Sequence, residues 1–308
     1  MKIAFINVYQ NKVNRGAETF VYELSKRLSK NHEVDILTEI NVFELFRKRY
    51  DIIIPTNGRF QAALVRKITW LYGGKVVISG QSGIGFDDRV NLYTFPNCFV
   101  ALTDFQLAWA RKINPFVRVV KIPNGVDLKM KKMGNLSINL PKPIILAVGA
   151  LEKNKRHDLT IKAVAKMNKG SLLVVGKGTN EMDLQKMGDK YLGKRFKIMA
   201  LPYNEMSRAY QVASVFAFPT VAWESFGIVL VEAMASGLPV VASDDPIRRE
   251  IVGDAGLFVD TTNTGEYANA LKKALESNWG DKPKRQAAKF EWDKIAQSYE
   301  KLFRELTK

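Results

Sequence analysis

The sequence has 308 residues, a length that suggests about two domains. Its hydrophobic content of 46% and charged content of 25% are ordinary for a globular protein and exclude a disordered or fibrous chain. The single cysteine, Cys98, excludes an internal disulfide framework, and the net charge of +16 points either to anionic partners or to a solvated basic surface.

The first half of the chain alternates short apolar runs with amphipathic segments. Strands are predicted at Ile3–Val8, Glu33–Leu37, Asp51–Pro55, Lys75–Ser79, Phe99–Thr103 and Arg118–Ile122. Helices are predicted between them at Ala17–Ser29, Val42–Arg49, Phe60–Leu71 and Asp104–Ile113. Valine- and isoleucine-rich runs that alternate with helices are typical of a doubly wound parallel sheet. This half is also the more basic, with 21 Lys and Arg against 11 Asp and Glu in residues 1–135.

A basic polar stretch, Lys129–Asn135, precedes Pro141 and Pro143 and is the best candidate for a linker. A second series of strands is predicted at Ile144–Gly149, Leu172–Gly176, Arg195–Met199, Val215–Phe218, Val240–Ser243 and Leu257–Val259. The last helix, from about Phe290 to Leu306, is amphipathic, so one of its faces packs on the protein. The pattern predicts two α/β domains, residues 1–135 and 140–288, followed by a helix in residues 289–308.

The most informative segment is Phe218–Pro239, which contains the carboxylates Glu224 and Glu232 on either side of an apolar Phe-Gly turn. Glu232 lies in an apolar helix predicted at Ile228–Ser236. A carboxylate there is costly unless something hydrogen-bonds to it, and a sugar or ribose diol is a suitable partner. The helix start also presents backbone N–H groups, which favour a phosphate.

This segment resembles the donor-site signature of the retaining glycosyltransferases of family 4. That signature is Pro-Ser/Thr, two Glu separated by seven residues, and a small-residue helix running to Gly-x-Pro. The matching residues here are Pro219, Thr220, Glu224, Glu232, Ala233–Gly237 and Pro239. The resemblance implies the GT-B fold, in which two Rossmann-like domains face a central cleft and the final helix, here residues 289–308, crosses back onto the first domain.

The resemblance implies a nucleotide-sugar donor site in the second domain. Lys155 and Glu224 are the expected catalytic residues, with Lys155 on the diphosphate and Glu224 on sugar hydroxyls. Glu232 is expected on the ribose, and Arg156 is expected to compensate for Ala150, which replaces the arginine usual in the family. The other expected donor-binding residues are Gly149, Gly176, Leu201, Phe226, Gly227, Ile228 and Val229.

The first domain is expected to bind the acceptor. Gly16 and Glu18 open its first helix, in a loop where Arg15 replaces the first glycine of the family's Gly-Gly-x-Glu. Gln81 lies near the position at which many members place a histidine beside the anomeric carbon, and Ser82 follows it. Within Pro123–Asp127, which resembles the family's inter-domain signature, Asn124 and Asp127 are expected to hydrogen-bond the hinge backbone.

The implied reaction transfers a hexose from a UDP- or GDP-sugar to a glycan or lipid-linked acceptor with retention of configuration. No Asp-x-Asp occurs in the chain, so neither a metal nor a further cofactor is expected. The two histidines, His32 and His157, have no metal-ligand or triad spacing and are expected to be structural.

The basic segment Arg59–Leu71 has an aromatic face, which can either pack on the first sheet or lie at an anionic membrane surface. No apolar run long enough to cross a bilayer occurs, and no cleavage site follows the first apolar segment. We therefore expect a cytoplasmic protein that is peripheral at the inner face of a membrane.

Two other classes of function remain open at this level. One is a catalytically degenerate GT-B protein that keeps a nucleotide pocket, which the departures at Arg15, Gln81 and Ala150 favour. The other is a basic nucleic-acid-binding module, although the chain lacks a recognition motif for one, and no nucleic acid is expected as a partner. A dinucleotide dehydrogenase is disfavoured because no Gly-x-Gly-x-x-Gly follows a strand.

Overall fold

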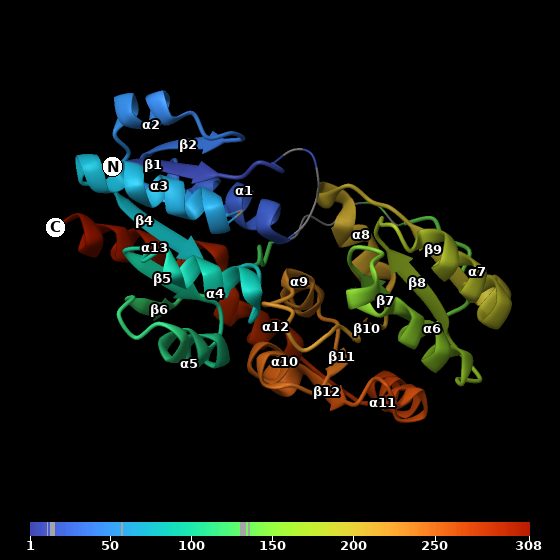
Figure 1. Cartoon of the computed structure of the whole chain (residues 1–308). Helices are drawn as coiled ribbons and strands as arrows, with labels where there is room; N and C mark the ends of the chain where they lie inside the picture. The colour runs from blue at the N-terminus through green and yellow to red at the C-terminus, as the bar shows by residue number, and fades with distance from the viewer. Residues whose placement is uncertain (11, 13–15, 57, 130–133, 135) are drawn as a thin grey trace. The chain divides into compact units, whose positions relative to one another are not determined.

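The structure is a computed structural model, and it describes residues 1–10, 12, 16–56, 58–129, 134 and 136–308 (Figure 1). The chain divides into two compact units. Unit 1 consists of Met1–Gly125, Trp223–Phe226 and Phe290–Lys308, and unit 2 consists of Val126–Ala222 and Gly227–Lys289. Unit 1 therefore takes its residues from three separate stretches of the chain, one of which lies inside the Phe218–Pro239 segment.

Unit 1 is built on a parallel six-stranded sheet in the order β2-β1-β3-β4-β5-β6. The strands are β1 (Lys2–Ile6), β2 (Glu33–Leu37), β3 (Ile52–Pro55), β4 (Lys75–Ser79), β5 (Cys98–Ala101) and β6 (Val119–Lys121). Strand β3 is apolar and buried along its whole length, and so is β1 after Lys2, because helices cover both faces of a doubly wound sheet. The strand order reverses between β1 and β3, and ligands of such sheets bind beyond the carboxyl ends of the strands at that point.

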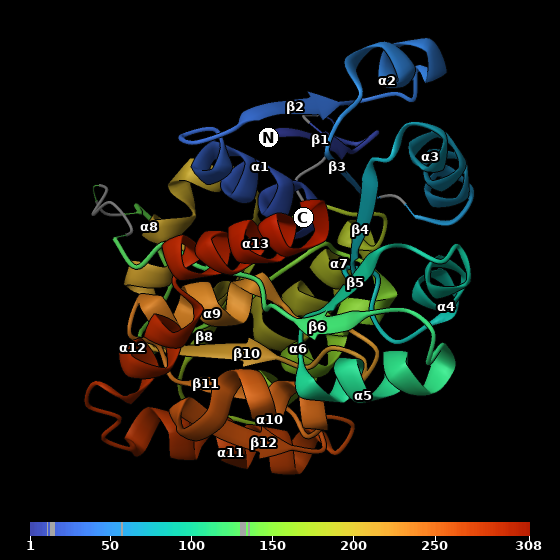
Figure 2. The same cartoon turned by 90° about the vertical axis from the view of Figure 1, so that its left-hand side faces the viewer.

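Each face of this sheet has its own hydrophobic core. One core is covered by α2 (Val42–Lys48), α3 (Arg59–Tyr72), α4 (Phe86–Tyr93) and α5 (Asp104–Ile113). The other lies under α1 (Gly16–Leu28) and α13 (Trp292–Thr307), which run side by side in Figure 2. In this second core, the rings of Trp292 and Tyr299 contact Phe20 of α1. Residues 290–308 are thus part of unit 1 and complete its core.

Unit 2 contains a second parallel six-stranded sheet, in the order β12-β11-β10-β7-β8-β9. Its strands are β7 (Ile144–Val148), β8 (Ser171–Val175), β9 (Phe196–Met199), β10 (Val215–Phe218), β11 (Val240–Ser243) and β12 (Gly256–Val259). Read from β9 to β12, the order is that of the dinucleotide-binding Rossmann sheet, with its reversal between β7 and β10. The loops after β7 and β10 are therefore the natural place for a ligand in unit 2.

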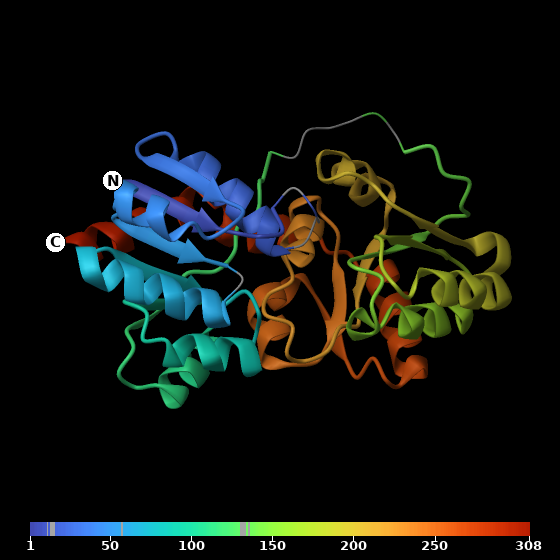
Figure 3. The ribbon, with the colours of Figure 1, turned by 45° about the horizontal axis from the view of Figure 1, so that its top comes forward.

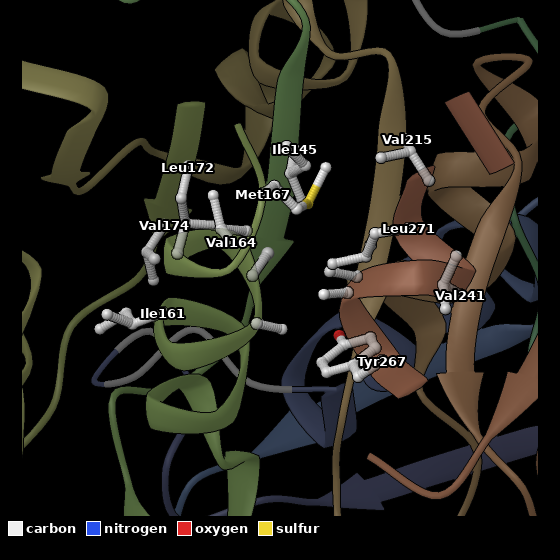
Figure 4. Packing of buried hydrophobic residues seen from close by; sticks show 14 of the residues in the cluster. Ile145, Ile161, Val164, Met167, Leu172, Val174, Val215, Val241, Tyr267 and Leu271 are labelled. Atoms are coloured by element: carbon white, nitrogen blue, oxygen red, sulfur yellow. The ribbon is translucent and has the colours of Figure 1, made fainter. Parts of the chain in front are cut away.

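The core of unit 2 lies between this sheet and the helices α6 (His157–Ala165), α7 (Glu181–Leu192) and α11 (Thr264–Glu276). Figure 4 shows Ile161 and Val164 of α6 and Tyr267 and Leu271 of α11 among the strand residues, and Figure 3 shows α6 and α7 along the same sheet. The remaining helices are α8 (Met206–Val212), α9 (Ile228–Ala235), α10 (Pro246–Val252) and α12 (Lys282–Ala287).

The prediction of doubly wound parallel sheets is confirmed, and every predicted strand is present to within two residues at its ends. The sequence reading missed α4, a short helix whose buried face includes the polar residues Asp88 and Asn91 and so lacks an apolar period. Most of the expected linker, residues 130–133 and 135, lies outside the described residues. Within the described part of the chain, no helix combines the length and apolar character needed to cross a bilayer.

Candidate functional site

The loops after β7 and β10 are joined to each other in unit 2. The carbonyl oxygen of Asn154, after β7, accepts hydrogen bonds from Thr220 Oγ1 and from the Val221 N–H, both after β10, each at 3.2 Å. These loops leave neighbouring strands at the point where the strand order reverses, so the fold itself brings them together.

Glycines bring the loops after β7 and β8 into backbone contact. A side chain on Gly176 would clash with the carbonyl oxygen of Gly149. A β-carbon on Gly178 would lie 2.5 Å from the carbonyl oxygen of Leu151. Between them, the Leu151 N–H donates to the Lys177 carbonyl at 2.9 Å. The Gly-x-Gly after β8 thus allows two loops to close on each other, which is a structural role beside the candidate ligand site.

Lys155 lies against Gly149, the first residue after β7. It ends a short 3₁₀ turn, Lys153–Lys155, and its Cγ and Cδ atoms lie 3.7 Å from the position that a β-carbon on Gly149 would take. Arg156 follows in the left-handed conformation, with φ of 54°. Its charge helps to lower the pKa of Asp260, although hydrogen bonds from Thr262 are the larger cause. Arg156 is therefore near the loop after β12, as well as next to Lys155 in sequence.

His157 is buried at the start of α6 and is 3% exposed. Burial, together with the charge of Lys155, lowers its pKa to about 4. The imidazole is therefore neutral near pH 7, and the positive charge of this loop comes from Lys155 and its neighbours. The structural role predicted for this histidine agrees with its burial.

Helix α9 begins directly after the Phe-Gly turn. Gly227, its N-cap, has φ of 83°, and a β-carbon there would also lie 2.8 Å from Phe218 Cζ, so glycine is required for two reasons. Because Gly227 has no side chain to cap the helix, the N–H groups of the first turn, at Ile228 and Val229, point out from the amino end of α9. A helix amino terminus of this kind favours an anion.

Glu232 lies one turn further along α9 and is 7% exposed. Its Oε2 atom accepts a hydrogen bond of 2.7 Å from the hydroxyl of Tyr210 in α8. Burial is the main cause that raises the pKa of Tyr210, so this hydroxyl keeps its proton and acts as the donor. The sequence reading missed Tyr210; the available signal was a carboxylate in an apolar helix, which requires a donor from elsewhere in the fold.

A buried ion pair braces the loop that leads to Glu224. Arg248 is fully buried, and its Nε atom donates to Asp245 at 2.8 Å. One terminal nitrogen of the same guanidinium donates to the carbonyls of Val221 and Ala222, each at 3.0 Å. Asp245 also caps α10. The sequence reading missed this pair, whose signal was an Asp-Pro helix start with an arginine three residues after the aspartate.

Leu201 lies in the loop after β9 and is half-buried. The end of β9 is tied to the Gly176 loop, since the Gly176 N–H donates to the Met199 carbonyl at 2.9 Å. Unit 2 therefore contains Gly149, Lys155, Arg156, Gly176, Leu201, Gly227, Ile228, Val229 and Glu232.

Glu224 and Phe226 belong to unit 1 instead, in the segment Trp223–Phe226. The hydroxyl of Ser225 donates to the Gln81 carbonyl at 2.9 Å, and a side chain on Gly83 would clash with the Trp223 carbonyl oxygen. The ring of Phe226 meets that of Phe290 edge-on, with centroids 5.6 Å apart. The contacts of Ser225 and Trp223 attach the Glu224 segment to the loop after β4, and Phe226 attaches it to Phe290, just before α13.

The side chain of Gln81 is occupied within the protein. Its Nε2 atom donates to Asn124 Oδ1 at 2.8 Å and to Ser79 Oγ at 2.9 Å, while its Oε1 atom accepts from Asn124 Nδ2 at 2.9 Å. Asn124, expected to bond the hinge backbone, is thus paired with a side chain. Asp127 does bond the local backbone, by accepting from the Lys129 N–H at 3.0 Å. Ser82, next to Gln81, is exposed.

A second polar network supports the same loop. Gln106 Nε2 donates to the Gly80 carbonyl at 2.8 Å and to Asp88 Oδ2 at 3.2 Å, and Asn91 donates to the other oxygen of Asp88. Full burial raises the pKa of Asp88 to about 8. The loop Gly80–Gly83 is consequently fixed by side chains from α4, α5 and the hinge.

In unit 1, α1 follows β1 and begins at Gly16, and Glu18 lies in its first turn. Glu18 is 6% exposed, and its Oε2 atom has no hydrogen-bond partner among the residues that the structure describes. Arg15, which replaces the first glycine of the family's Gly-Gly-x-Glu, lies outside the described residues. Glu18 therefore has a buried carboxylate oxygen in the helix that follows β1, the strand at which the strand order reverses.

Comparison with known families agrees with this geometry. A family model described as "Glycosyl transferases group 1" matches residues 129–290, which is more than half of the chain. The chain belongs to this family. The match covers the strands and loops of unit 2 that hold Gly149, Lys155 and Glu232.

Among curated relatives, this group 1 glycosyltransferase is 34% identical over 168 residues to a phosphatidyl-myo-inositol mannosyltransferase of Mycolicibacterium smegmatis, with 52% of the chain and 43% of the relative covered. It is 32% identical over 218 residues to a D-inositol 3-phosphate glycosyltransferase of Corynebacterium jeikeium, with 64% and 52% covered. The chain thus spans about half the length of the curated relatives it matches.

Among solved structures, the group 1 glycosyltransferase chain is similar to sucrose-phosphate synthase from Thermosynechococcus elongatus, with a TM-score of 0.80, 20% identity and 99% of each chain covered. Anabaena HepE in complex with UDP-glucose gives a TM-score of 0.80 at 19% identity, with 99% of this chain and 100% of that chain covered. At these identities the similarity establishes the fold, which is GT-B.

No group of His, Cys, Asp and Glu side chains suited to a metal ion occurs in the part of this glycosyltransferase that the structure describes. The residues predicted for the donor fall into two sets. Nine of them lie in unit 2, whereas Glu224 and Phe226 lie in unit 1 together with Gly16, Glu18, Gln81 and Ser82.

Proposed function

We propose that the protein is a retaining, metal-independent glycosyltransferase that moves a hexose from a UDP- or GDP-sugar to a glycan or lipid-linked acceptor. The observation that carries this proposal is the position of Lys155 beside Gly149. Its loop lies in backbone contact with Gly176 and Gly178, at the point where the strand order of unit 2 reverses. A cation at that point suits a diphosphate, and the adjacent β10 leads into the amino terminus of α9.

Lys155 and the first turn of α9 are proposed to hold the diphosphate, with Arg156 as a second cation. The buried His157 is neutral and adds no charge there. Negative charge develops on the departing phosphate as the bond to the sugar breaks, so a fixed cation and helix N–H groups stabilise the transition state more than the ground state. No bound metal is required for that role.

Glu232 is proposed to accept hydrogen bonds from the ribose hydroxyls. Its Oε2 atom already accepts from Tyr210, which fixes the orientation of the carboxylate. Leu201, in the loop after β9, is proposed to contact the base. Glu224 is proposed to bind sugar hydroxyls from the segment that Ser225 attaches to Gln81.

The acceptor is proposed to bind unit 1. The Glu18 oxygen that has no hydrogen-bond partner among the described residues and the exposed Ser82 hydroxyl are proposed to bind acceptor hydroxyls. In the proposed reaction, the bond between the anomeric carbon and the phosphate oxygen breaks, and a bond to the acceptor oxygen forms on the same face of the sugar. The departing phosphate takes the proton of the acceptor hydroxyl, so atoms and charges balance without a protein nucleophile.

The matched relatives support these choices of donor and acceptor. Their names include a mannosyltransferase acting on a phosphatidyl-inositol and a Campylobacter jejuni N-acetylgalactosaminyltransferase acting on a diphospho-undecaprenol. The solved structure of HepE contains UDP-glucose. A hexose donor with a uracil base and a lipid-linked acceptor are therefore the first combination to test.

The test measures thermal stabilisation by UDP and by GDP, followed by donor turnover, for wild type and Lys155→Ala. Nucleotide at a hundredfold over its Kd adds about 2.7 kcal/mol to the free energy of unfolding. We expect one of the two nucleotides to stabilise the wild type. We also expect Lys155→Ala to lose turnover by about 10²–10³-fold, as expected for one lost contact to a transition-state anion.

Lys186→Ala, which removes an exposed lysine of α7, is the matched control and is expected to keep full turnover. Turnover is also expected to be unchanged in EDTA. Full activity of Lys155→Ala would refute the phosphate assignment. Stabilisation by a nucleotide with no turnover of any donor would favour the catalytically degenerate alternative.

A further inference from the structure

Helix α3 has an apolar stripe on its solvent side in addition to its buried side. Ala62, Val65 and Ile68 pack into the core of unit 1. The residues Phe60, Leu64, Lys67 and Leu71 follow one another at spacings of four, three and four, which places them on a single face of a helix. Phe60 is 89% exposed and Leu71 is 64% exposed, so this second face is uncovered.

Large apolar side chains extend this face toward α4. Trp70 is 74% exposed, and Phe86, the first residue of α4, is 72% exposed. The guanidinium of Arg59 lies 5.9 Å from the centre of the Phe86 ring, and Arg66 Nε donates to the Phe95 carbonyl at 2.8 Å just beyond α4. Figures 1 and 2 both show α3 and α4 side by side. We call the set Phe60, Leu64, Lys67, Trp70, Leu71 and Phe86 the aromatic–basic face.

The charges of α3 have one sign. The helix contains Arg59, Arg66 and Lys67 and no acidic residue. Lys67 is exposed within the stripe itself, and Arg59 is only partly neutralised by an exposed ion pair with Asp87. A symmetric dimer through this face would place Lys67 of one copy near that of the other, which is unfavourable. An apolar surface of this composition instead suits a partner that offers hydrocarbon together with negative charge.

We propose that the aromatic–basic face docks unit 1 on an anionic lipid surface. Aromatic and leucine side chains enter the boundary between headgroups and acyl chains, while lysine and arginine bind the anionic headgroups. This inference rests on the proposed function, because a lipid-linked acceptor would be reached from such a surface. It adds which face of the protein meets the membrane and with what chemistry.

The experiment is co-sedimentation of the full chain with phosphatidylcholine vesicles that contain one of two amounts of phosphatidylglycerol, none or about a third. We expect binding only to the anionic vesicles, decreasing as salt is raised. Phe60→Ser/Leu71→Ser should lower the partition coefficient at least tenfold, and Lys67→Gln by about fivefold, the value of one charge near an anionic surface.

Matched controls come from unit 2, where Met182→Ser removes an exposed apolar side chain of α7 and Lys186→Gln removes an exposed charge of the same helix. Both are expected to bind vesicles as the wild type does. Failure of the wild type to bind anionic vesicles would overturn the proposal, as would equal binding by the Phe60→Ser/Leu71→Ser variant. Self-association that is lost in that variant, without vesicle binding, would assign the face to a second copy instead.

A cooperative urea unfolding transition of every variant shows that each is folded, and nucleotide stabilisation, measured on the same variants, separates this inference from the proposed function. Vesicle binding without any nucleotide response would support the docking face and contradict the proposed transferase function. A nucleotide response without vesicle binding would contradict only the docking face.

Discussion

The loops of unit 2 and the loop after β4 in unit 1 are held in place by different means. In unit 2, Gly149, Gly176 and Gly178 allow backbones to meet directly, so the loops after β7 and β8 are fixed by main-chain contacts. In unit 1, the Gly80–Gly83 loop is held by side chains, among them Asn124 and Gln106, which lie 43 and 26 residues from their partners Gln81 and Gly80. A loop that is fixed by its backbone can therefore be recognised from a short motif, whereas a loop that is fixed by side chains depends on residues distant in the sequence.

The largest expected effect tests whether main-chain contacts alone hold the loops of unit 2, because the Arg248 side chain also hydrogen-bonds to one of these loops. Arg248→Met should destabilise the protein by about 3–5 kcal/mol, since it leaves Asp245 buried without its partner and removes the two hydrogen bonds to the loop carbonyls of Val221 and Ala222. Urea unfolding, followed by tryptophan fluorescence, measures the change.

Arg249→Met is the control for this experiment, because the neighbouring arginine is largely exposed and pairs with the exposed Asp244. Its unfolding midpoint should stay close to that of the wild type. An Arg248→Met variant as stable as Arg249→Met would show that the brace is dispensable and that main-chain contacts suffice in unit 2.

The next effect tests the glycine contacts themselves. Gly176→Ala should destabilise unit 2 by about 1–3 kcal/mol and weaken nucleotide binding, because the new methyl group collides with a rigid carbonyl of Gly149. Nucleotide titration by calorimetry, beside urea unfolding, measures both effects. Gly265→Ala is the matched control, because a β-carbon at this position in α11 would meet only ordinary contacts, 3.4 Å from Asn263 Oδ1 and 4.0 Å from Lys166 Nζ. Equal behaviour of the two variants would contradict the close approach of the loops.

The smallest effect concerns the side-chain network of unit 1. A double-mutant cycle with Gln81→Ala and Asn124→Ala should give a coupling energy of roughly 1 kcal/mol, because each residue donates to the other. Urea unfolding of the four proteins measures it. Additive losses of unfolding free energy would mean that the two amides act independently. Gln81 would then again be a candidate for acceptor binding, as proposed from the sequence.

The contrast between the units also explains what the sequence could predict. Valine- and isoleucine-rich strands and the segment around Glu224 and Glu232 are local patterns, so the sheets and the family were accessible from them. Tyr210, Arg248 and Gln106 act across elements that only the fold brings together, and no local period marks them. Helix α4 was missed for a related reason, since Asp88 and Asn91 replace apolar residues on its buried face.

Gln81 shows the limit most clearly. Its position near the family's usual histidine suggested a ligand-facing side chain, but chemical type alone does not reveal which partner satisfies an amide. The partners of the Gln81 side chain are Asn124 and Ser79, and the Gln81 backbone carbonyl accepts a hydrogen bond from the Ser225 hydroxyl.

The packing of α13 on α1 has a consequence for how the protein is made. The ring of Trp292 lies against Phe20, so the core of unit 1 stays incomplete until Phe290–Lys308 has left the ribosome. Translation of the intervening unit 2 takes on the order of ten seconds. During that time the uncovered side of the nascent first sheet offers Phe20, Val21 and Leu24 to solvent, and it is the surface that a cotranslational chaperone would recognise on this chain.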